Sequence, residues 1–174
     1  MSSEASKPGK SEAFVKFTLE QCQKHKGGIA AELKRADNPA TEYQCWEHLA
    51  VFHINLEKDY ERLPYATIAA AIAKAKVDHN GSIGIGRAIT LCYEDGNNSD
   101  PAKAKLRRLL ACESVDEVCR ILRPLFSLID AKAGVTLNYT QLLTDLLKFH
   151  WDSQHVKTRW AQDFYRRLAS KEGA

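Results

Sequence analysis

The chain has 174 residues, of which 44% are hydrophobic and 27% charged, and its formal net charge is +3. This length suits one domain, or two small bundles that share a core, and the composition is ordinary for a soluble globular protein. The longest nearly apolar stretch, 65–73, falls far short of the ~20 residues that cross a bilayer, which excludes a membrane-spanning protein. A net charge this small gives only a weak indication of an anionic partner.

The first half of the chain predicts an N-terminal helical sub-bundle over residues 11–80, after a disordered leader at 1–10. Two helices are expected before residue 36, the first from Ser11 to Gly27-Gly28 and the second from Ile29 to Lys34.

The next two helices of this half are predicted from prolines. Asn38 and Pro39 suit an N-cap and a first helical position, and Pro64 is expected to open a further helix in the same way. The helix that starts at Asn38 is expected to turn these side chains toward the core: Tyr43, Trp46, Leu49 and Ala50.

Residues 81–170 predict a C-terminal helical sub-bundle with clearer punctuation. A polar loop at 94–100 leads to Pro101 at the start of a helix. Ser114 and Glu117 match a capping box, in which each side chain satisfies a backbone donor at the helix start.

The remaining helices of this half also have recognisable ends. Pro124 predicts a kink, Gly134 ends that helix, Asn138 caps the next, and residues 152–153 begin the last. No stretch alternates with a period of two. We therefore predict an all-α fold of eight or nine helices, arranged as two adjoining sub-bundles in one structural unit.

The cysteines and the N-terminus indicate a cytoplasmic protein. The five cysteines are an odd number without a CxxC pair, so neither a disulfide framework nor a zinc site is expected. The first ten residues, MSSEASKPGK, lack the apolar core of a signal peptide.

Two patterns that suggest enzyme chemistry are weak. Gly81, Gly84 and Gly86 are spaced as G-x-x-G-x-G without a preceding strand, so close helix packing is favoured over a phosphate loop. The histidine pairs are five residues apart, which is not the i, i+4 spacing of a helical zinc site. No catalytic residue, metal ligand or cofactor is therefore predicted, and a small hydrolase that uses His48 and His150 is kept only as an alternative.

Positive charge is concentrated in the second half of the chain. Residues 1–80 hold 11 Lys and Arg against 11 Asp and Glu, whereas residues 101–174 hold 13 against 8. Acidic neighbours reduce some of this charge, because Asp116 lies four residues before Arg120 and Asp163 four residues after Arg159. Among the tryptophans, Trp151 is the one outside the predicted apolar stripes, and is therefore the candidate for base stacking.

Several ordered motifs resemble the small subunit of the type I-E CRISPR surveillance complex Cascade, the CasB family. The resemblance covers about residues 28–168 and depends on six segments: LKRA at 33–36, GIGRAI at 84–89, LRRLLA at 106–111, LRPL at 122–125, LNYTQLL at 137–143 and RWAQDFY at 159–165.

This resemblance implies a non-catalytic subunit of antiviral defence that helps to hold the R-loop. Its implied partners are the crRNA-bound backbone and large subunit, a second copy of itself, and the displaced single DNA strand, with crRNA as a further candidate. Sequence-tolerant contacts of Lys and Arg to phosphates suit such a role. The predicted nucleic-acid contacts are Lys34, Arg35, Arg87, Lys105, Arg107, Arg108, Arg123, Lys157 and Arg159.

The chain departs from the family pattern at Lys34, where arginine is usual, and in a longer loop at 94–100. An alternative remains open, in which the bundle only joins protein subunits and its arginines face acidic protein surfaces.

Overall fold

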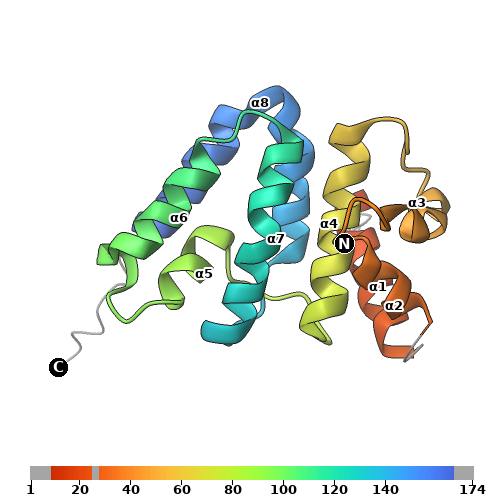
Figure 1. The fold of residues 1–174 in the computed structure, drawn as a ribbon, viewed down its shortest axis with the longest axis horizontal. Coiled ribbons are helices and arrows are strands. Elements are labelled where there is room, and N and C mark those ends of the chain that lie inside the picture. The colour runs from red at the N-terminus through yellow and green to blue at the C-terminus, as the bar shows by residue number, and fades with distance from the viewer. Residues whose placement is uncertain (1–8, 25–27, 167–174) are drawn as a thin grey trace, which may run out of the picture.

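The computed structural model describes residues 9–24 and 28–166, and within these ranges the fold is all-α, as predicted (Figure 1). The elements of this described part are eight α-helices and two 3-10 helices: α1 Lys10–Lys24, α2 Ile29–Arg35, η1 Glu42–Cys45, α3 Trp46–Val51, α4 Asp59–Ala75, α5 Ile85–Leu91, η2 Gly96–Asn98, α6 Asp100–Leu110, α7 Val115–Lys132 and α8 Tyr139–Tyr165. An isolated bridge joins Ile83 and Leu137. Most of the predicted leader and Gly27 lie outside the described residues.

Helix α4 is the centre of the molecule. Every residue from 63 to 73 is buried, and five of these eleven residues are alanines. Small side chains allow neighbouring helices to approach on all sides, and α4 packs against α1 and α2 as well as against α7 and α8. Figure 1 shows α4 between the N-terminal helices on one side and α7 on the other. The predicted boundary between the sub-bundles, near residue 80, falls in the connection between α4 and α5.

The predicted starts of α7 and α8 are confirmed by their capping contacts. The Ser114 hydroxyl accepts the Glu117 N–H at 3.2 Å, and the Glu117 carboxylate accepts the Glu113 N–H at 2.7 Å. The Asn138 side chain accepts the Gln141 N–H at 3.0 Å at the start of α8. These side chains satisfy backbone donors that a helix leaves free at its first turn.

Helix α8 is broken at Asp152, close to the predicted start of a separate last helix. The φ of −146° and ψ of 58° at this residue are not helical. Its carboxylate accepts the His155 N–H at 3.4 Å, which caps the second part of α8. The break lets the two parts pack on each other, and Phe149 stacks with Trp160 at a centroid distance of 6.1 Å.

Two predictions for the first half were wrong. Asn38 and Pro39 lie in a turn rather than at a helix start, because the Asn38 side chain accepts the nearby Ala40 N–H. Pro64 lies inside α4, which begins five residues earlier at Asp59.

The predicted core face of the third helix was also largely wrong. Leu49 is buried, but Tyr43, Trp46 and Ala50 are exposed. Residues 42–51 form a 3-10 turn followed by a six-residue helix, so the side chains do not follow one continuous helical stripe.

Within the described ranges, no helix combines the length and the apolar character needed to cross a membrane.

Candidate nucleic-acid interface

Helix α6 presents the densest group of cations. The Ser99 hydroxyl caps the helix by accepting the Ala102 N–H at 3.3 Å, and Pro101 lies in its first turn. Its buried side chains are Ala102, Leu106 and Leu109, spaced so that they share one face. The cations of the segment consequently lie on the sides of the helix that face away from the core: Lys103, Lys105, Arg107 and Arg108.

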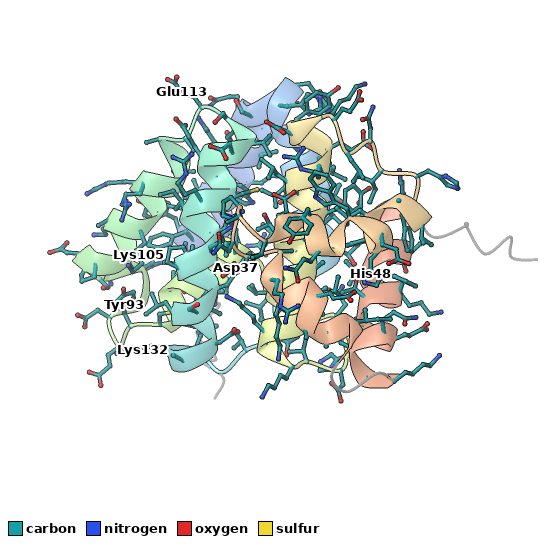
Figure 2. The ribbon with its side chains drawn as sticks, turned by 45° about the vertical axis from the view of Figure 1, so that its right-hand side comes forward. Asp37, His48, Tyr93, Lys105, Glu113 and Lys132 are labelled. Carbon is teal, nitrogen blue, oxygen red and sulfur yellow. The ribbon has the colours of Figure 1, made fainter. Side chains whose placement is uncertain are left out.

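A groove runs along the seam between α6 and α7. It consists of two adjoining hollows, of about 110 and 300 Å³, that share Arg108 and Ile121. We call it the α6–α7 groove, and it is lined by Lys105, Arg108, Ala111, Cys112, Glu117, Arg120, Ile121, Pro124 and Leu125. Figure 2 shows Lys105 on α6 near this seam and Glu113 in the turn at its upper end. The floor is partly apolar and its edges carry mainly positive charge.

Lys157 of α8 adds a further cation near the upper end of the groove. Burial raises the pKa of the Cys112 thiol and Glu117 acts in the same direction, whereas the charges of Lys157 and Arg108 lower it. Lys157 and Arg108 therefore both lie close enough to Cys112 for their charges to affect its thiol. The Lys157 ammonium is also 5.6 Å from the centre of the Phe149 ring.

These cations are free of ion pairs within the described part of the chain. No carboxylate there lies within 4.0 Å of Lys105, Arg107, Arg108 or Lys157. Arg120, which was not among the predicted contacts, also lines the groove, but it pairs with Asp116 as its spacing predicted. A cation without a protein partner is the one most available to a phosphate.

Arg159, by contrast, is held by a buried carboxylate. Its guanidinium donates to Asp145 at 2.9 Å, and Asp145 also accepts from the side chains of Gln141 and Trp160. Asp145 is only 4% exposed, and burial raises its pKa although Arg159 lowers it. The charge of Arg159 is therefore paired within the protein, although 40% of its side chain is exposed.

Arg87 belongs to the contact between α5 and α8. Its backbone N–H donates to the Asp163 carboxylate at 2.8 Å, so Asp163 caps α5 from α8. A Cβ at Gly86 would lie 2.7 Å from the Phe164 nitrogen, and one at Gly84 would lie 3.0 Å from Asp163 Cγ. Real Cβ atoms essentially never approach so closely, which confirms the prediction that these glycines permit close packing.

Arg123 lies on another side of α7. A helix turns by about 100° per residue, which separates Arg123 from Ile121 and Pro124 on the groove side. Its side chain is 15% exposed, its Nε lacks a hydrogen-bond partner, and it lies 4.0 Å from Asp37, which also pairs with Lys74. Figure 2 shows Asp37 next to α7.

The two predicted contacts on α2 lie far from the groove. Arg35 donates to the Gln44 side chain at 2.7 Å, and Lys34 lines a cavity of about 520 Å³ with Lys76 and Asp78. Figure 1 shows α2 and α6 at opposite ends of the molecule. The structure thus brings together Lys105, Arg108 and Lys157, and leaves Arg107 exposed on α6 beside them. It places the other five predicted residues elsewhere or in internal contacts.

Two features considered from the sequence, a metal site and a hydrolase that uses His48 and His150, concern residues that the structure describes. No group of three His, Cys, Asp or Glu side chains in residues 9–24 and 28–166 is arranged to hold a metal ion. His48 is engaged by Glu32 at 2.8 Å, and His150 stacks on Tyr60.

Comparison with known proteins gives one relative at 28% identity over 112 residues, a CRISPR-associated protein Cse2 of Thermus thermophilus. The match covers 64% of this chain and 62% of that relative, less than two thirds of its length.

Two solved structures share the fold. CasB of Thermobifida fusca is 16% identical with a TM-score of 0.70, over 91% of this chain and 99% of that one. A chain of a CRISPR RNA-guided surveillance complex is 24% identical with a TM-score of 0.64, over 90% and 91% of the two chains. At these identities the likeness shows the fold alone.

The family model named CRISPR-associated protein Cse2 matches residues 30–165, from the second residue of α2 to the end of α8. This match confirms the resemblance predicted from the ordered motifs. The chain belongs to the CRISPR-associated Cse2 family.

Proposed function

We propose that this chain is the non-catalytic small subunit of a type I-E CRISPR surveillance complex, Cascade, and that it binds the displaced DNA strand of the R-loop. The family match and the likeness to a chain of an RNA-guided surveillance complex support membership of such an assembly. The crRNA-bound backbone, the large subunit and a second copy of this chain are its proposed protein partners.

The observation that carries the DNA contact is the set of cations without ion pairs at the α6–α7 groove. Lys105 and Arg108 line this groove, and the charge of Lys157 from α8 acts on Cys112 at its upper end. Arg107 is exposed on the neighbouring side of α6. Such cations bind phosphates without reading sequence, as a guided complex requires, since base pairing with the guide selects the target. An R-loop is a nearly balanced exchange of duplexes, so a few backbone contacts to the freed strand can favour it.

Charge reversal in the reconstituted complex tests the proposal. The variant Arg107→Glu, Arg108→Glu and Lys157→Glu is assembled with guide RNA and the partner subunits, and crosslinking to the displaced strand is measured at ~150 mM salt. The charge-matched control reverses three lysines that are exposed elsewhere on the described surface: Lys16, Lys24 and Lys132. We expect crosslinking and R-loop yield to fall in the first variant only.

Equal crosslinking in parent and groove variant would contradict the proposal. A second candidate function, a subunit that only joins proteins, is favoured by the exposed Tyr43, Trp46 and Val51 around α3, because such exposed apolar side chains are typical of protein contacts. Loss of assembly with unchanged DNA crosslinking in assembled complexes would favour this candidate.

A further inference from the structure

Exposed aromatic rings gather where α4 begins and where α8 is broken. Trp151 is 67% exposed, the highest value among the large hydrophobic side chains of the described residues. Tyr60, at the start of α4, is 38% exposed and stacks on His150 with ring centres 4.1 Å apart and planes at 17°. In α8, Trp151 therefore presents an exposed ring, and the preceding residue, His150, forms a stacked pair with Tyr60 of α4.

The position of Trp151 follows from the break in α8. It is the last residue before the non-helical Asp152, so it lies at the end of the first part of the helix rather than between the two parts. Trp160 fills the core instead, where it is 3% exposed and donates to Asp145. Trp151 thus leaves a large apolar ring in water without a contribution to the core.

Cations lie over the exposed rings. The Lys148 ammonium is 5.2 Å from the Trp151 ring centre, and the Lys58 ammonium is 5.8 Å from that of Tyr60. Asp152 lies 3.6 Å from Lys148 and offsets part of its charge. A ring that stacks with a base, next to an ammonium that contacts a phosphate, is the arrangement by which proteins hold single strands irrespective of sequence.

We propose that Trp151, together with the Tyr60–His150 pair, stacks with unpaired bases of a single-stranded nucleic acid. Lysines flank these rings. In the other exposed aromatic cluster, around α3, the cation over Trp46 is Arg62, which is only 16% exposed and pairs with Glu42 and Asp59. That cluster also includes the aliphatic Val51 and suits a protein partner better. This inference rests on the proposed function, according to which the single strand is the displaced DNA.

The stacking site adjoins the upper end of the α6–α7 groove. Figure 1 shows the turn between α6 and α7 and the break in α8 at the same end of the molecule. Lys157 follows the break by about one and a half helical turns, and its charge lowers the pKa of the Cys112 thiol in that groove. A strand whose phosphates follow the groove would therefore arrive at the aromatic rings.

Binding of two matched oligonucleotides to the full-length chain tests this inference. One is oligodeoxythymidine and the other has the same length and phosphates but lacks bases. In a Trp46→Phe background, quenching of fluorescence reports Trp151, since Trp160 is buried. We expect quenching by the base-containing strand only.

Substitutions then distinguish the contribution of the Trp151 ring to binding from that of the neighbouring charge. Trp151→Ala is expected to weaken binding of the base-containing strand by about fivefold or more, the low end of the effect of one stacking aromatic. It should leave the abasic strand unaffected, and Trp151→Phe should retain most of the affinity. Tyr43→Ala, an exposed aromatic on η1, is the matched control and should have no effect.

Unchanged binding by Trp151→Ala, or equal quenching by both strands, would overturn the inference. So would a parent chain that does not bind the base-containing strand at low salt. Normal oligonucleotide binding by Trp151→Ala with failed incorporation into the complex would identify a protein contact instead. Failure of the groove proposal is distinct, because it appears as unchanged binding in the Arg107, Arg108 and Lys157 reversals while Trp151→Ala still weakens binding.

Discussion

Gly84 leaves the space that the Asp163 carboxylate occupies when it caps α5 from α8. The carboxylate accepts the Arg87 N–H at 2.8 Å, and a Cβ at Gly84 would lie 3.0 Å from its Cγ. Asp163, which reduces the positive charge of the last helix, therefore also joins α8 to α5 through a hydrogen bond between residues 76 positions apart in the chain.

A double-mutant cycle should reveal this coupling. We expect Gly84→Ala and Asp163→Ala each to lower the free energy of unfolding by about 1–2 kcal/mol, through displacement or loss of the cap. Their effects should not add, because the added methyl group has less to displace once the carboxylate is absent. Urea unfolding measures all four proteins.

Gly86 is the control for this cycle. An added Cβ there would meet backbone atoms of α8, including the Phe164 nitrogen at 2.7 Å, and backbone cannot move aside as a side chain can. Gly86→Ala should therefore cost more than Gly84→Ala, and Asp163→Ala should not relieve it. Additive effects at Gly84 and Asp163 would contradict the assigned cap.

The salt dependence of single-strand binding should distinguish cations without an ion pair from cations that are paired within the protein. Each phosphate contact to a single strand contributes about 0.7 to the slope of log affinity against log salt concentration. Arg108→Ala should reduce this slope by about that amount, whereas Arg159→Ala should leave it unchanged, because Asp145 already holds Arg159. The measurement is a binding titration at several salt concentrations, and equal slope changes would show that both arginines reach the strand.

Asp145 predicts a defined pH dependence of stability. Burial raises the pKa of its carboxyl above the ordinary 3.8, with opposing effects from Arg159, Gln141 and Trp160. A raised pKa in the folded state favours the protonated acid, so its stabilising effect is complete below pH 3.8 and is lost as the pH rises through the folded-state pKa.

The Asp145→Asn variant lacks this titration. The unfolding free energy of the parent relative to this variant should therefore decrease from pH 3.8 toward neutral pH. Urea unfolding of both proteins over this range gives the difference. An increase with pH would show instead that Arg159 stabilises the ionised carboxylate more than burial disfavours it.

Ser114 should contribute to stability through its position in the capping box of α7, and not merely because it is a serine. Ser114→Ala should lower the unfolding free energy by about 1 kcal/mol, because the Glu117 N–H loses its acceptor. Ser127, exposed within the same helix, is the matched control, and its replacement by alanine should change stability by no more than about 0.5 kcal/mol. Similar effects at both positions would assign the loss to something other than the cap.

Helix ends with local signals could be predicted from the sequence. Ser114 and Asn138 accept backbone N–H groups three residues further on, and Gly134 adopts a positive φ of 61°. The structure places helix ends at each of the three. The turn at Asn38 could not be predicted, because the same residue types begin helices and form turns. The 3-10 helix after this turn contains buried Glu42, which Arg62 holds at 2.6 Å from twenty residues further along the chain.

The candidate site shows the same limit. The free cations of α6 follow from its apolar spacing, since Leu106 and Leu109 fix which residues face outward. The pairing of Arg159 with Asp145 is not visible in the sequence, because the two are 14 residues apart and meet only through the break in α8. Long-range ion pairs decide which basic residues are available, and the sequence does not record them.

The central position of α4 has a consequence for how the molecule unfolds. Since α1 and α2 cover one side of this helix and α7 and α8 another, neither half keeps its core fully covered when the other is lost. A fragment that begins at residue 81 would expose to water the apolar faces of α7 and α8 that α4 normally covers. The two halves should therefore melt in a single cooperative transition, and the chain should resist division into separately expressed halves.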